Sequence, residues 1–320
     1  MRKLLKVLGV ILVGIVLAVV IALSYVFLSL PKSEPAPNIT VQATPARLEQ
    51  GKYLATHVTG CVYCHSVRNA KLYAEPVVSG TEGQGSIFIQ DPGRGILVAP
   101  NITPAALKDW SDGEILRAMI SGVNRKGKPL FPIMPYQEFA VMSREDLYSV
   151  IAYIRSLDPK PSTIPETHLK FPLNLIVRTI PQPTAIREQA TANRGEYLTT
   201  IAGCRNCHTP QGERGVKMAG MDFAGGMEFQ TGDGSVVRSA NITPDDGTGI
   251  GKWSREQFLS VFKRYESPAL QQIPVERGNT VMPWVFFSGM KEEDLAAIYD
   301  YLRTVKPIDH RILNKTLQLP

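Results

Sequence analysis

Cys61-Val62-Tyr63-Cys64-His65 recurs as Cys204-Arg205-Asn206-Cys207-His208, and the two copies contain all four cysteines of the 320-residue chain. Cysteines at positions i and i+3 lie on the same side of a helical turn, so both thiols of one copy can reach one edge of a flat macrocycle. The pattern C-x-x-C-H is typical of covalent attachment of a c-type haem, in which the following His binds the iron. The sequence therefore predicts two covalently bound haem c groups, one at each copy.

Other uses of paired cysteines fit this spacing less well. A zinc site needs two C-x-x-C pairs, or one pair and two His, close together in the chain. Here the two pairs are 143 residues apart. A thioredoxin-like C-x-x-C does not require a following His. Disulfides stay open as an alternative in an exported chain, because four cysteines allow three pairings.

The N-terminus predicts export. Arg2, Lys3 and Lys6 precede an uncharged run over residues 7–30. As a helix this run would span about 36 Å, enough to cross a hydrocarbon core of about 30 Å. A cleaved secretory signal, the alternative, has a shorter apolar region, and Ala22-Leu23-Ser24 is a weak cleavage site. We expect a signal-anchor over residues 1–30, with the basic end in the cytoplasm and the globular part on the periplasmic side of a bacterial inner membrane.

The rest of the chain contains two copies of one sequence repeat. The matched segments are Gly51-Lys52-Tyr53-Leu54 with Gly195-Glu196-Tyr197-Leu198, Asn101-Ile102-Thr103-Pro104 with Asn241-Ile242-Thr243-Pro244, Trp110-Ser111 with Trp253-Ser254, and Met134-Pro135 with Met282-Pro283. The offset drifts between 140 and 148 residues, which indicates short loop insertions. We expect two tandem domains, over residues 47–158 and 185–310, with a tether at 31–46 and a C-terminal tail at 311–320.

Residues 159–184 form the expected connector between the two domains. Six prolines lie within it, so a stiff segment is expected rather than a flexible Gly/Ser linker. Its stretch at residues 171–180 is apolar enough to pack across a domain face and far too short to span a membrane.

Local patterns predict mainly helical domains. Capping boxes begin helices at Ser111 and Ser254, and Ser143 begins the last helix of the first domain. Each domain also carries a short predicted hairpin. The first pairs residues 87–89 with 96–98, and the second pairs Phe229 with residues 236–237 around a turn at 231–234.

A haem iron bound by one His needs a ligand on its other face or an open position. His57, His168 and His310 have no counterpart in the other repeat, so ordinary surface roles are expected for them. Methionine offers two repeat-matched pairs, Met134 with Met282 and Met142 with Met290. Met134 and Met282 each precede a proline, which fixes the turn that would present the thioether, so they are the predicted iron ligands. Met142 and Met290 stand just before a helix and are expected to pack in the core.

Composition argues against a nucleic-acid partner. The formal charge of +6 is spread thinly: residues 45–160 carry a net charge of +2 and residues 185–310 a net charge of −2. Neither domain is the basic surface that binds nucleic acid.

The order Gly-x-Tyr-Leu, C-x-x-C-H, Met-Pro and closing helix resembles class I cytochrome c. The segment from Asn-Ile-Thr-Pro to Trp-Ser is similar to the cytochrome c subunits of membrane-bound alcohol, gluconate and sorbitol dehydrogenases. The resemblance covers residues 48–305 and implies two tandem class I domains whose first and last helices cross. It also implies aromatic contacts of Tyr53 with Tyr153 and of Tyr197 with Tyr301. For Asn101, Asn241, Trp110 and Trp253 it implies contacts on the propionate side, with plain packing as the alternative.

The sequence differs from those subunits in one respect. They typically carry three haem motifs behind a cleavable signal, whereas this chain has two behind a predicted anchor. The resemblance thus supports electron transfer more than it supports any named dehydrogenase partner.

The expected function is a membrane-anchored dihaem cytochrome. It would relay electrons from a dehydrogenase or a quinol-linked donor to a downstream cytochrome or oxidase. His/Met ligation raises the reduction potential and fills both axial positions of the iron, so we assign no catalytic residue. The alternative is a dihaem enzyme of the peroxidase or thiosulfate dehydrogenase type, with one open haem site.

Overall fold

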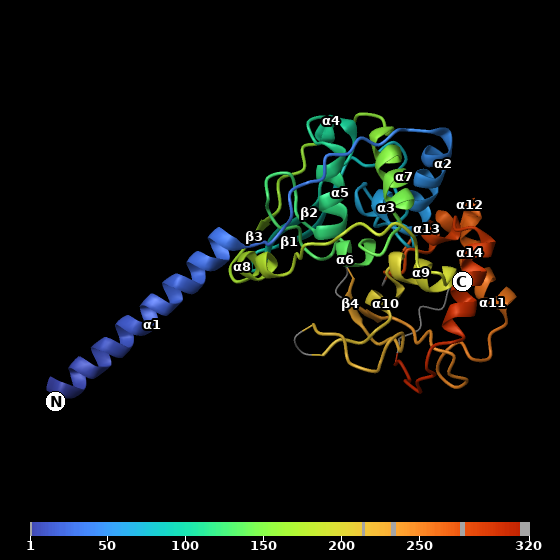
Figure 1. The fold of residues 1–320 in the computed structure, drawn as a ribbon. Coiled ribbons are helices and arrows are strands. Elements are labelled where there is room, and N and C mark those ends of the chain that lie inside the picture. The colour runs from blue at the N-terminus through green and yellow to red at the C-terminus, as the bar shows by residue number, and fades with distance from the viewer. Residues whose placement is uncertain (1, 213–214, 232–234, 276–278, 314–320) are drawn as a thin grey trace.

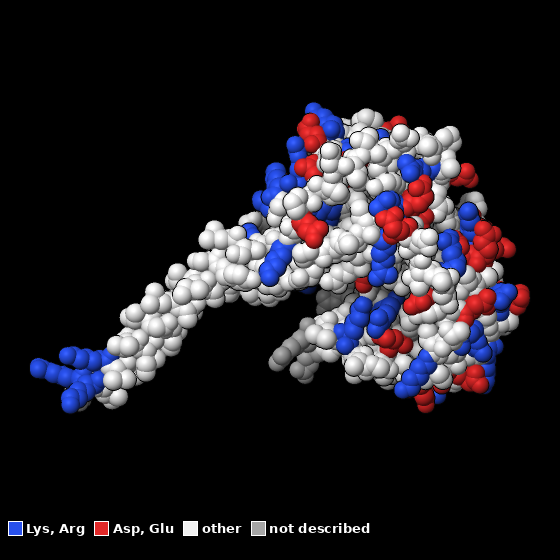
Figure 2. Space-filling view, in the orientation of Figure 1, with Lys and Arg blue, Asp and Glu red and all other residues white. Residues whose placement is uncertain are grey.

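A computed structural model describes residues 2–212, 215–231, 235–275 and 279–313. A long helix, α1 (Arg2–Ser29), extends away from a globular part that contains the rest of the described chain (Figure 1). Its surface is uncharged except at the free end, where Lys and Arg gather (Figure 2). Within the described ranges, α1 is the one helix long and apolar enough to cross a membrane; a signal sequence would pass the same test. None of its residues is buried against the protein.

The globular part is mostly helical and contains two similar units. The elements of the first are α2 (Pro45–Tyr53), a π-helical turn η1 (Leu54–Val58), α3 (Cys61–Cys64), β1 (Ser86–Asp91), β2 (Gly95–Ala99), α4 (Pro104–Leu107), α5 (Asp112–Ser121), α6 (Tyr136–Phe139) and α7 (Arg144–Arg155). Those of the second are α9 (Arg194–Ile201), α10 (Cys204–Cys207), β4 (Glu228–Gln230), β5 (Val236–Arg238), α11 (Arg255–Lys263), η3 (Arg264–Glu266), α12 (Pro268–Gln271), α13 (Trp284–Ser288) and α14 (Glu292–Leu302).

The local predictions are confirmed. Both capping boxes are present, with Ser111 and Ser254 as the N-caps of α5 and α11. Ser143 caps α7 through the backbone N–H of Asp146. Strands β1 and β2 form one antiparallel hairpin and β4 and β5 form the other; the predicted turn of the second includes residues 232–234, which lie outside the described ranges.

In each unit the first and last long helices meet at a glycine. A Cβ built on Gly51 of α2 would lie 1.9 Å from the carbonyl oxygen of Ser149 in α7. A Cβ on Gly195 of α9 would lie 2.0 Å from the carbonyl oxygen of Ala297 in α14. Only a residue without a side chain allows the backbones to approach this closely. The glycine of the repeated Gly-x-Tyr-Leu segment is therefore a packing requirement of the fold.

The two units share one continuous hydrophobic core. Its buried side chains come from both, with Leu54, Leu116 and Leu147 on one side and Leu198, Leu295 and Leu302 on the other. Helix α13 of the second unit packs on η1 of the first, and α6 of the first packs on α9 of the second. The two units therefore form one packed globular body rather than two separate domains joined only by a linker.

Reciprocal polar contacts cross the same interface. The Tyr53 hydroxyl donates a hydrogen bond to Asp294 Oδ2 at 2.5 Å, and the Tyr197 hydroxyl donates one to Asp146 Oδ2 at 2.5 Å. The expected aromatic contacts of Tyr53 with Tyr153 and of Tyr197 with Tyr301 stay predictions, while the hydroxyls of Tyr53 and Tyr197 bind the opposite unit. Tyr53 ends α2 and Tyr197 lies within α9, and a carboxylate across the interface satisfies the polar end of each side chain.

The tether and the connector both lie on the first unit. Ile39 and Val41 pack against the core, and the Val41 N–H donates to Asp112 Oδ2 at 2.8 Å. The connector adds a third strand, β3 (His168–Leu169), beside β2, followed by α8 (Leu173–Ile176) and a 3₁₀ turn η2 (Val177–Thr179). Residues 171–180 pack across a domain face only in part: Val177 is buried and Leu173 and Leu175 are half-buried, whereas Phe171 and Ile176 are exposed.

Candidate functional site

Each C-x-x-C-H segment forms one helical turn that begins at a left-handed glycine. Gly60 has φ 73° before α3, and Gly203 has φ 71° before α10. Other residues adopt this conformation only with strain, so glycine sets where each turn begins. All four cysteines are free thiols. The two sulfurs of each turn therefore remain available to a ligand that lies along its side.

The two His side chains are held in the same way. His65 Nδ1 lies 2.6 Å from the Pro100 carbonyl oxygen, and His208 Nδ1 lies 2.7 Å from the Ala240 carbonyl oxygen. A carbonyl oxygen only accepts, so Nδ1 must carry the proton in both rings. Nε2 then keeps its lone pair, and the hydrogen bond fixes the ring orientation, as a metal-binding imidazole requires.

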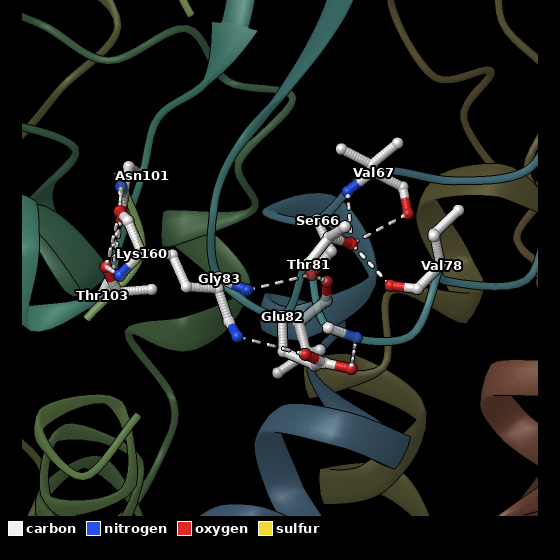
Figure 3. A network of polar contacts seen from close by, with 11 residues as sticks. Ser66, Val67, Val78, Thr81, Glu82, Gly83, Asn101, Thr103 and Lys160 are labelled. Atoms are coloured by element: carbon white, nitrogen blue, oxygen red, sulfur yellow. Dashed lines mark hydrogen bonds and ion pairs between the residues drawn. The ribbon is translucent and has the colours of Figure 1, made fainter. Parts of the chain in front are cut away.

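The repeated Asn-Ile-Thr-Pro segment directly follows the two carbonyl groups that hold the His rings. Asn101 Oδ1 accepts from the backbone N–H and the hydroxyl of Thr103, both at 2.8 Å, and its amide donates to the Lys160 carbonyl at 2.6 Å (Figure 3). In the second unit Asn241 binds Thr243 in the same way and donates to the Ile308 carbonyl at 2.8 Å.

Both polar ends of each asparagine are thus used inside the fold. In each unit the asparagine connects the chain after the last helix to the segment whose preceding carbonyl orients the His ring. The Asn-Ile-Thr-Pro motif therefore supports the site. For Asn101 and Asn241, these hydrogen bonds favour a structural role inside the fold over the alternative, contacts with haem propionates. Trp110 is half-buried against the core, and Trp253 is exposed.

The two Met-Pro segments share one backbone conformation. The Tyr136 N–H donates to the Met134 carbonyl at 2.8 Å, and the Trp284 N–H donates to the Met282 carbonyl at 2.8 Å. The intervening prolines have φ −82°, ψ 57° and φ −80°, ψ 67°. These values describe an inverse γ-turn, which the proline ring favours by fixing φ.

The two pairs of methionines differ in burial. Met134 and Met282 are half-buried at the edge of the core. Met142 and Met290 are fully buried, with 0% and 1% of their surface exposed, which confirms their predicted packing role.

Burial sets the electrostatics of both segments. It lowers the pKa of His65 and of His208, while the carbonyl bonds oppose the shift, so both imidazoles are held neutral. It raises the pKa of Cys204 to about 12. Burial also raises the pKa of Cys64 to about 11; Arg68 opposes this rise, whereas the thiols of Cys61 and Cys207 add to it.

The Cys207 thiol raises the pKa of Cys64, although the two residues belong to different units. The second cysteine of one turn thus lies within electrostatic reach of the second cysteine of the other. Tyr63, which lies between the first pair of cysteines, also contacts Phe286 of the second unit with ring centroids 5.7 Å apart. The two C-x-x-C-H turns therefore face the interface between the units.

Arg68 is a charged group that sequence reasoning missed. Its guanidinium lies 5.1 Å from the Tyr63 ring centroid and pairs with Glu75 at 2.9 Å. Its Nε is buried without a hydrogen-bond partner among the described residues, as is the hydroxyl of Tyr136, two residues after Met134. The position of Arg68, three residues after His65, could have indicated a charged group beside the first site. The second copy does not repeat this pattern, because Gln211 stands three residues after His208.

The donor set fits haem c better than a bare metal ion. Each turn offers two thiols on one side, a neutral imidazole with Nε2 available and, from another part of the same unit, a half-buried thioether. In the part of the chain that the structure describes, no three His, Cys, Asp or Glu side chains gather as a metal cluster. The orphaned Arg68 Nε beside the first turn also fits a cofactor with polar substituents.

The three other histidines lie in structural positions. His57 packs in the interface, with Nδ1 3.1 Å from the Phe286 carbonyl oxygen. His310 Nδ1 lies 2.9 Å from the Ala224 carbonyl oxygen. His168 is exposed in β3. The expected surface role is confirmed for His168, whereas it is wrong for His57 and His310, which are half-buried and bound to backbone carbonyl groups.

The chain is similar over most of its length to cytochrome c subunits of membrane dehydrogenases and to a dihaem cytochrome c. It is 28% identical to the cytochrome c subunit of an alcohol dehydrogenase (quinone) from Gluconacetobacter polyoxogenes, over 84% of this chain and 58% of that protein. It is 27% identical to a gluconate 2-dehydrogenase cytochrome c subunit from Pantoea cypripedii, over 82% of this chain and 60% of the relative. A diheme cytochrome c-type protein of Cereibacter sphaeroides is 28% identical over 78% of this chain and 83% of its own length.

The chain therefore spans somewhat more than half the length of the dehydrogenase subunits that it matches. No protein-family model matches the chain.

Proposed function

We propose that this chain is a membrane-anchored dihaem c-type cytochrome that relays electrons within or beside a membrane dehydrogenase complex. The observation that carries the proposal is the repeated geometry of the two sites. In both units a C-x-x-C-H turn, a carbonyl-held His and a Met-Pro γ-turn occur in the same order with matching hydrogen bonds. The similarity to cytochrome c subunits and to a dihaem cytochrome supports the same conclusion.

Each unit would be a class I cytochrome c domain, residues 47–158 and 185–310, joined by the connector at 159–184. The helix contacts at Gly51 and Gly195 support this division, because the first and last helices of each unit meet there. In the first domain Cys61 and Cys64 would hold the haem covalently, with His65 and Met134 as iron ligands. In the second domain Cys204, Cys207, His208 and Met282 would have the same roles.

Haem c, when bound, supplies a one-electron couple at its iron. The chain's own residues then set the conditions for electron transfer. The carbonyls of Pro100 and Ala240 keep each imidazole neutral and oriented. The Met-Pro turns would present a soft thioether to the haem iron, which would favour its reduced state and, together with the imidazole, would occupy the places at which a substrate could bind. A relay is thus a better account of these ligands than catalysis.

The interface supports transfer between the two sites. Helix α13 of the second unit packs on η1, which leads into the first C-x-x-C-H turn, and Tyr63 of that turn contacts Phe286 of the second unit. The shared core holds this arrangement rigid, so little reorganisation accompanies a change of charge. We propose that the electron passes directly from one domain to the other.

The partners follow from the relatives and from α1. Helix α1 would anchor the chain in the bacterial inner membrane, with the globular part on the periplasmic side; the basic free end seen in Figure 2 fits the cytoplasmic side. A dehydrogenase or quinol-linked donor would supply electrons, and a soluble cytochrome or an oxidase would accept them. The names of the relatives make a dehydrogenase complex the preferred donor.

Optical spectra of Met variants test the proposal. Met134→Ala and Met282→Ala should each remove about half of the methionine–iron charge-transfer absorbance of the oxidised protein and create one site that binds CO. Met142→Leu and Met290→Leu, in the fully buried core pair, are the matched controls and should change neither property. Rapid CO or peroxide binding by the unsubstituted protein would instead favour the dihaem enzyme.

A further inference from the structure

The connector exposes apolar side chains at one place on the globular part. Phe171, two residues before the short helix α8, is 75% exposed, and Ile176, the last residue of α8, is 50% exposed. Leu173 and Leu175 between them are half-buried. We call residues 170–180 the α8 segment. Two large exposed apolar side chains on one short segment favour a surface that something else covers.

The α8 segment is tied to the end of α1. The guanidinium of Arg178 donates to the Leu30 carbonyl oxygen at 2.8 Å and lies 5.1 Å from the Phe27 ring centroid. Figure 1 shows α8 beside the point where α1 leaves the globular part. The exposed apolar side chains therefore lie where the long apolar helix begins to project.

The length of α1 places this junction at a membrane surface. Its uncharged run over residues 7–30 spans about 36 Å as a helix, close to the roughly 30 Å of a hydrocarbon core. If the basic end lies at the cytoplasmic face, the opposite boundary falls near Phe27 and Leu30. These are the two residues that Arg178 contacts.

The rest of the segment suits a membrane interface. Lys32, Arg94 and Lys170 are exposed around it, and Lys170 Nζ donates to the Pro92 carbonyl at 2.6 Å in the turn between β1 and β2. Lys and Arg carry their charge on long apolar stems, which lets apolar neighbours enter the lipid while the charge stays at headgroup level. Pairing of β3 with β2 holds the segment firmly on the first unit.

We propose that the α8 segment is a second membrane contact, which inserts Phe171 and Ile176 into the outer interfacial layer of the bilayer that α1 enters. This inference rests on the proposed anchoring by α1. The lipid is the chosen occupant because the segment is continuous with the apolar helix through Arg178. Two attachment points, one spanning and one interfacial, would fix how the globular part faces the membrane, where α1 alone would leave it free to tilt.

Photo-cross-linking of the full, haem-loaded chain in lipid nanodiscs tests the contact. The cross-linking residue p-benzoylphenylalanine replaces Phe171, or Val16 in α1, or the exposed aromatic Trp253 just before α11. Figure 1 shows α11 on the side of the globular part away from α1, so position 253 is the matched control. After illumination, the mass of each labelled peptide reports whether a lipid is attached.

The proposal expects lipid adducts at positions 16 and 171 and none at 253. An adduct at 16 without one at 171 overturns the second contact and leaves the anchor intact. An adduct at 171 without one at 16 supports the contact and overturns the anchoring by α1. Absence at both positions overturns both, and a protein adduct at 171 in place of lipid shows that a second copy covers the segment and overturns the proposal.

Discussion

The hydroxyl of Tyr53, in the first unit, donates a 2.5 Å hydrogen bond to the carboxylate of Asp294, in the last helix of the second. Tyr197 and Asp146 form the reverse contact at the same distance. Each hydroxyl also accepts from a backbone N–H at the start of the opposing helix, that of Lys291 or of Ser143, at 3.3 Å. The interface is thus pseudo-symmetric, and the tyrosine of each Gly-x-Tyr-Leu segment stabilises the partner unit.

Removing the Tyr53 hydroxyl and removing the Tyr197 hydroxyl should lower the stability of the globular part by different amounts. Arg194 also holds Asp294, through two bonds of 2.9 Å, so Tyr53→Phe should lower the free energy of unfolding by about 1 kcal/mol. Among the residues that the structure describes, Asp146 would keep only the Gln50 amide, at 3.0 Å, as a side-chain hydrogen-bond partner, so Tyr197→Phe should lower the free energy of unfolding by about 2–3 kcal/mol. Denaturant unfolding in detergent measures both.

The matched control is Tyr299→Phe, whose hydroxyl donates to the Trp253 carbonyl inside one unit at 2.7 Å. It should not loosen the interface. Equal losses for all three variants would contradict a special role of the Tyr–Asp pairs between units.

The two helix-contact glycines should tolerate no side chain. Gly51→Ala or Gly195→Ala would place a methyl group about 2 Å from a backbone carbonyl oxygen, which cannot move independently of its helix. Overpacking of this kind costs about 1–3 kcal/mol or more, beyond the helix propensity gained. Gly14→Ala in α1, with nothing within 4 Å of the new Cβ, is the helical control and should be neutral. Unfolding that is unchanged in Gly51→Ala would contradict the close contact of α2 with α7.

His57 should make the interface sensitive to acid. Burial lowers its pKa; Lys263 and Lys52 act in the same direction, while the Phe286 carbonyl and Glu266 oppose it. A folded pKa below the unfolded value means that the unfolded chain binds the proton first. The free energy of unfolding should therefore fall as the pH drops below about 6.5, the usual His value, and level off below the folded pKa.

Denaturant unfolding at several pH values between about 5 and 8, the range in which His titrates, separates His57 from other groups. His57→Gln should reduce the acid-induced loss, since Gln can still donate to the Phe286 carbonyl. His168→Gln, at an exposed position in β3, is the control and should leave the pH profile unchanged. A profile that is the same with and without His57 would refute this origin of the acid sensitivity.

Local cations should set the two haem potentials separately. Burial raises the pKa of Cys64 and of Cys207; Arg68 opposes the rise at Cys64 and Lys217 opposes it at Cys207, so each cation acts on one attachment turn. A positive charge opposes the extra positive charge of the oxidised iron and thus raises the reduction potential. Arg68→Gln should lower one of two midpoint potentials in an optical redox titration, and Lys217→Gln should lower the other. If both variants shift the same potential, the two sites are wrongly assigned.

The sequence contained the local features of this protein more fully than the contacts between its parts. The capping boxes, both hairpins and the burial of Met142 and Met290 follow from periodicity and short motifs, because they depend on neighbouring residues. Tyr53 gave no sign of its partner Asp294, 241 residues away, since nothing local specifies which carboxylate it meets.

The candidate site shows the same division. The thiols, the His residues and the Met-Pro turns were visible as repeated motifs. The role of Asn101 in supporting the carbonyl that holds His65 was not, because the bond runs through the fold to Lys160. The apolar composition of residues 171–180 predicts packing across a domain face, but the exposure of Phe171 and Ile176 beside α1 depends on where the chain returns after α7.

The central claim is that the chain carries two covalently bound haems, one on each C-x-x-C-H turn. Intact mass spectrometry of the purified protein under denaturing conditions tests it most directly, because only thioether-linked haem remains attached after unfolding. The account predicts a polypeptide mass increased by two haem groups, falling to one in either Cys61→Ala with Cys64→Ala or Cys204→Ala with Cys207→Ala. A bare polypeptide mass from cells that make other c-type cytochromes would contradict it.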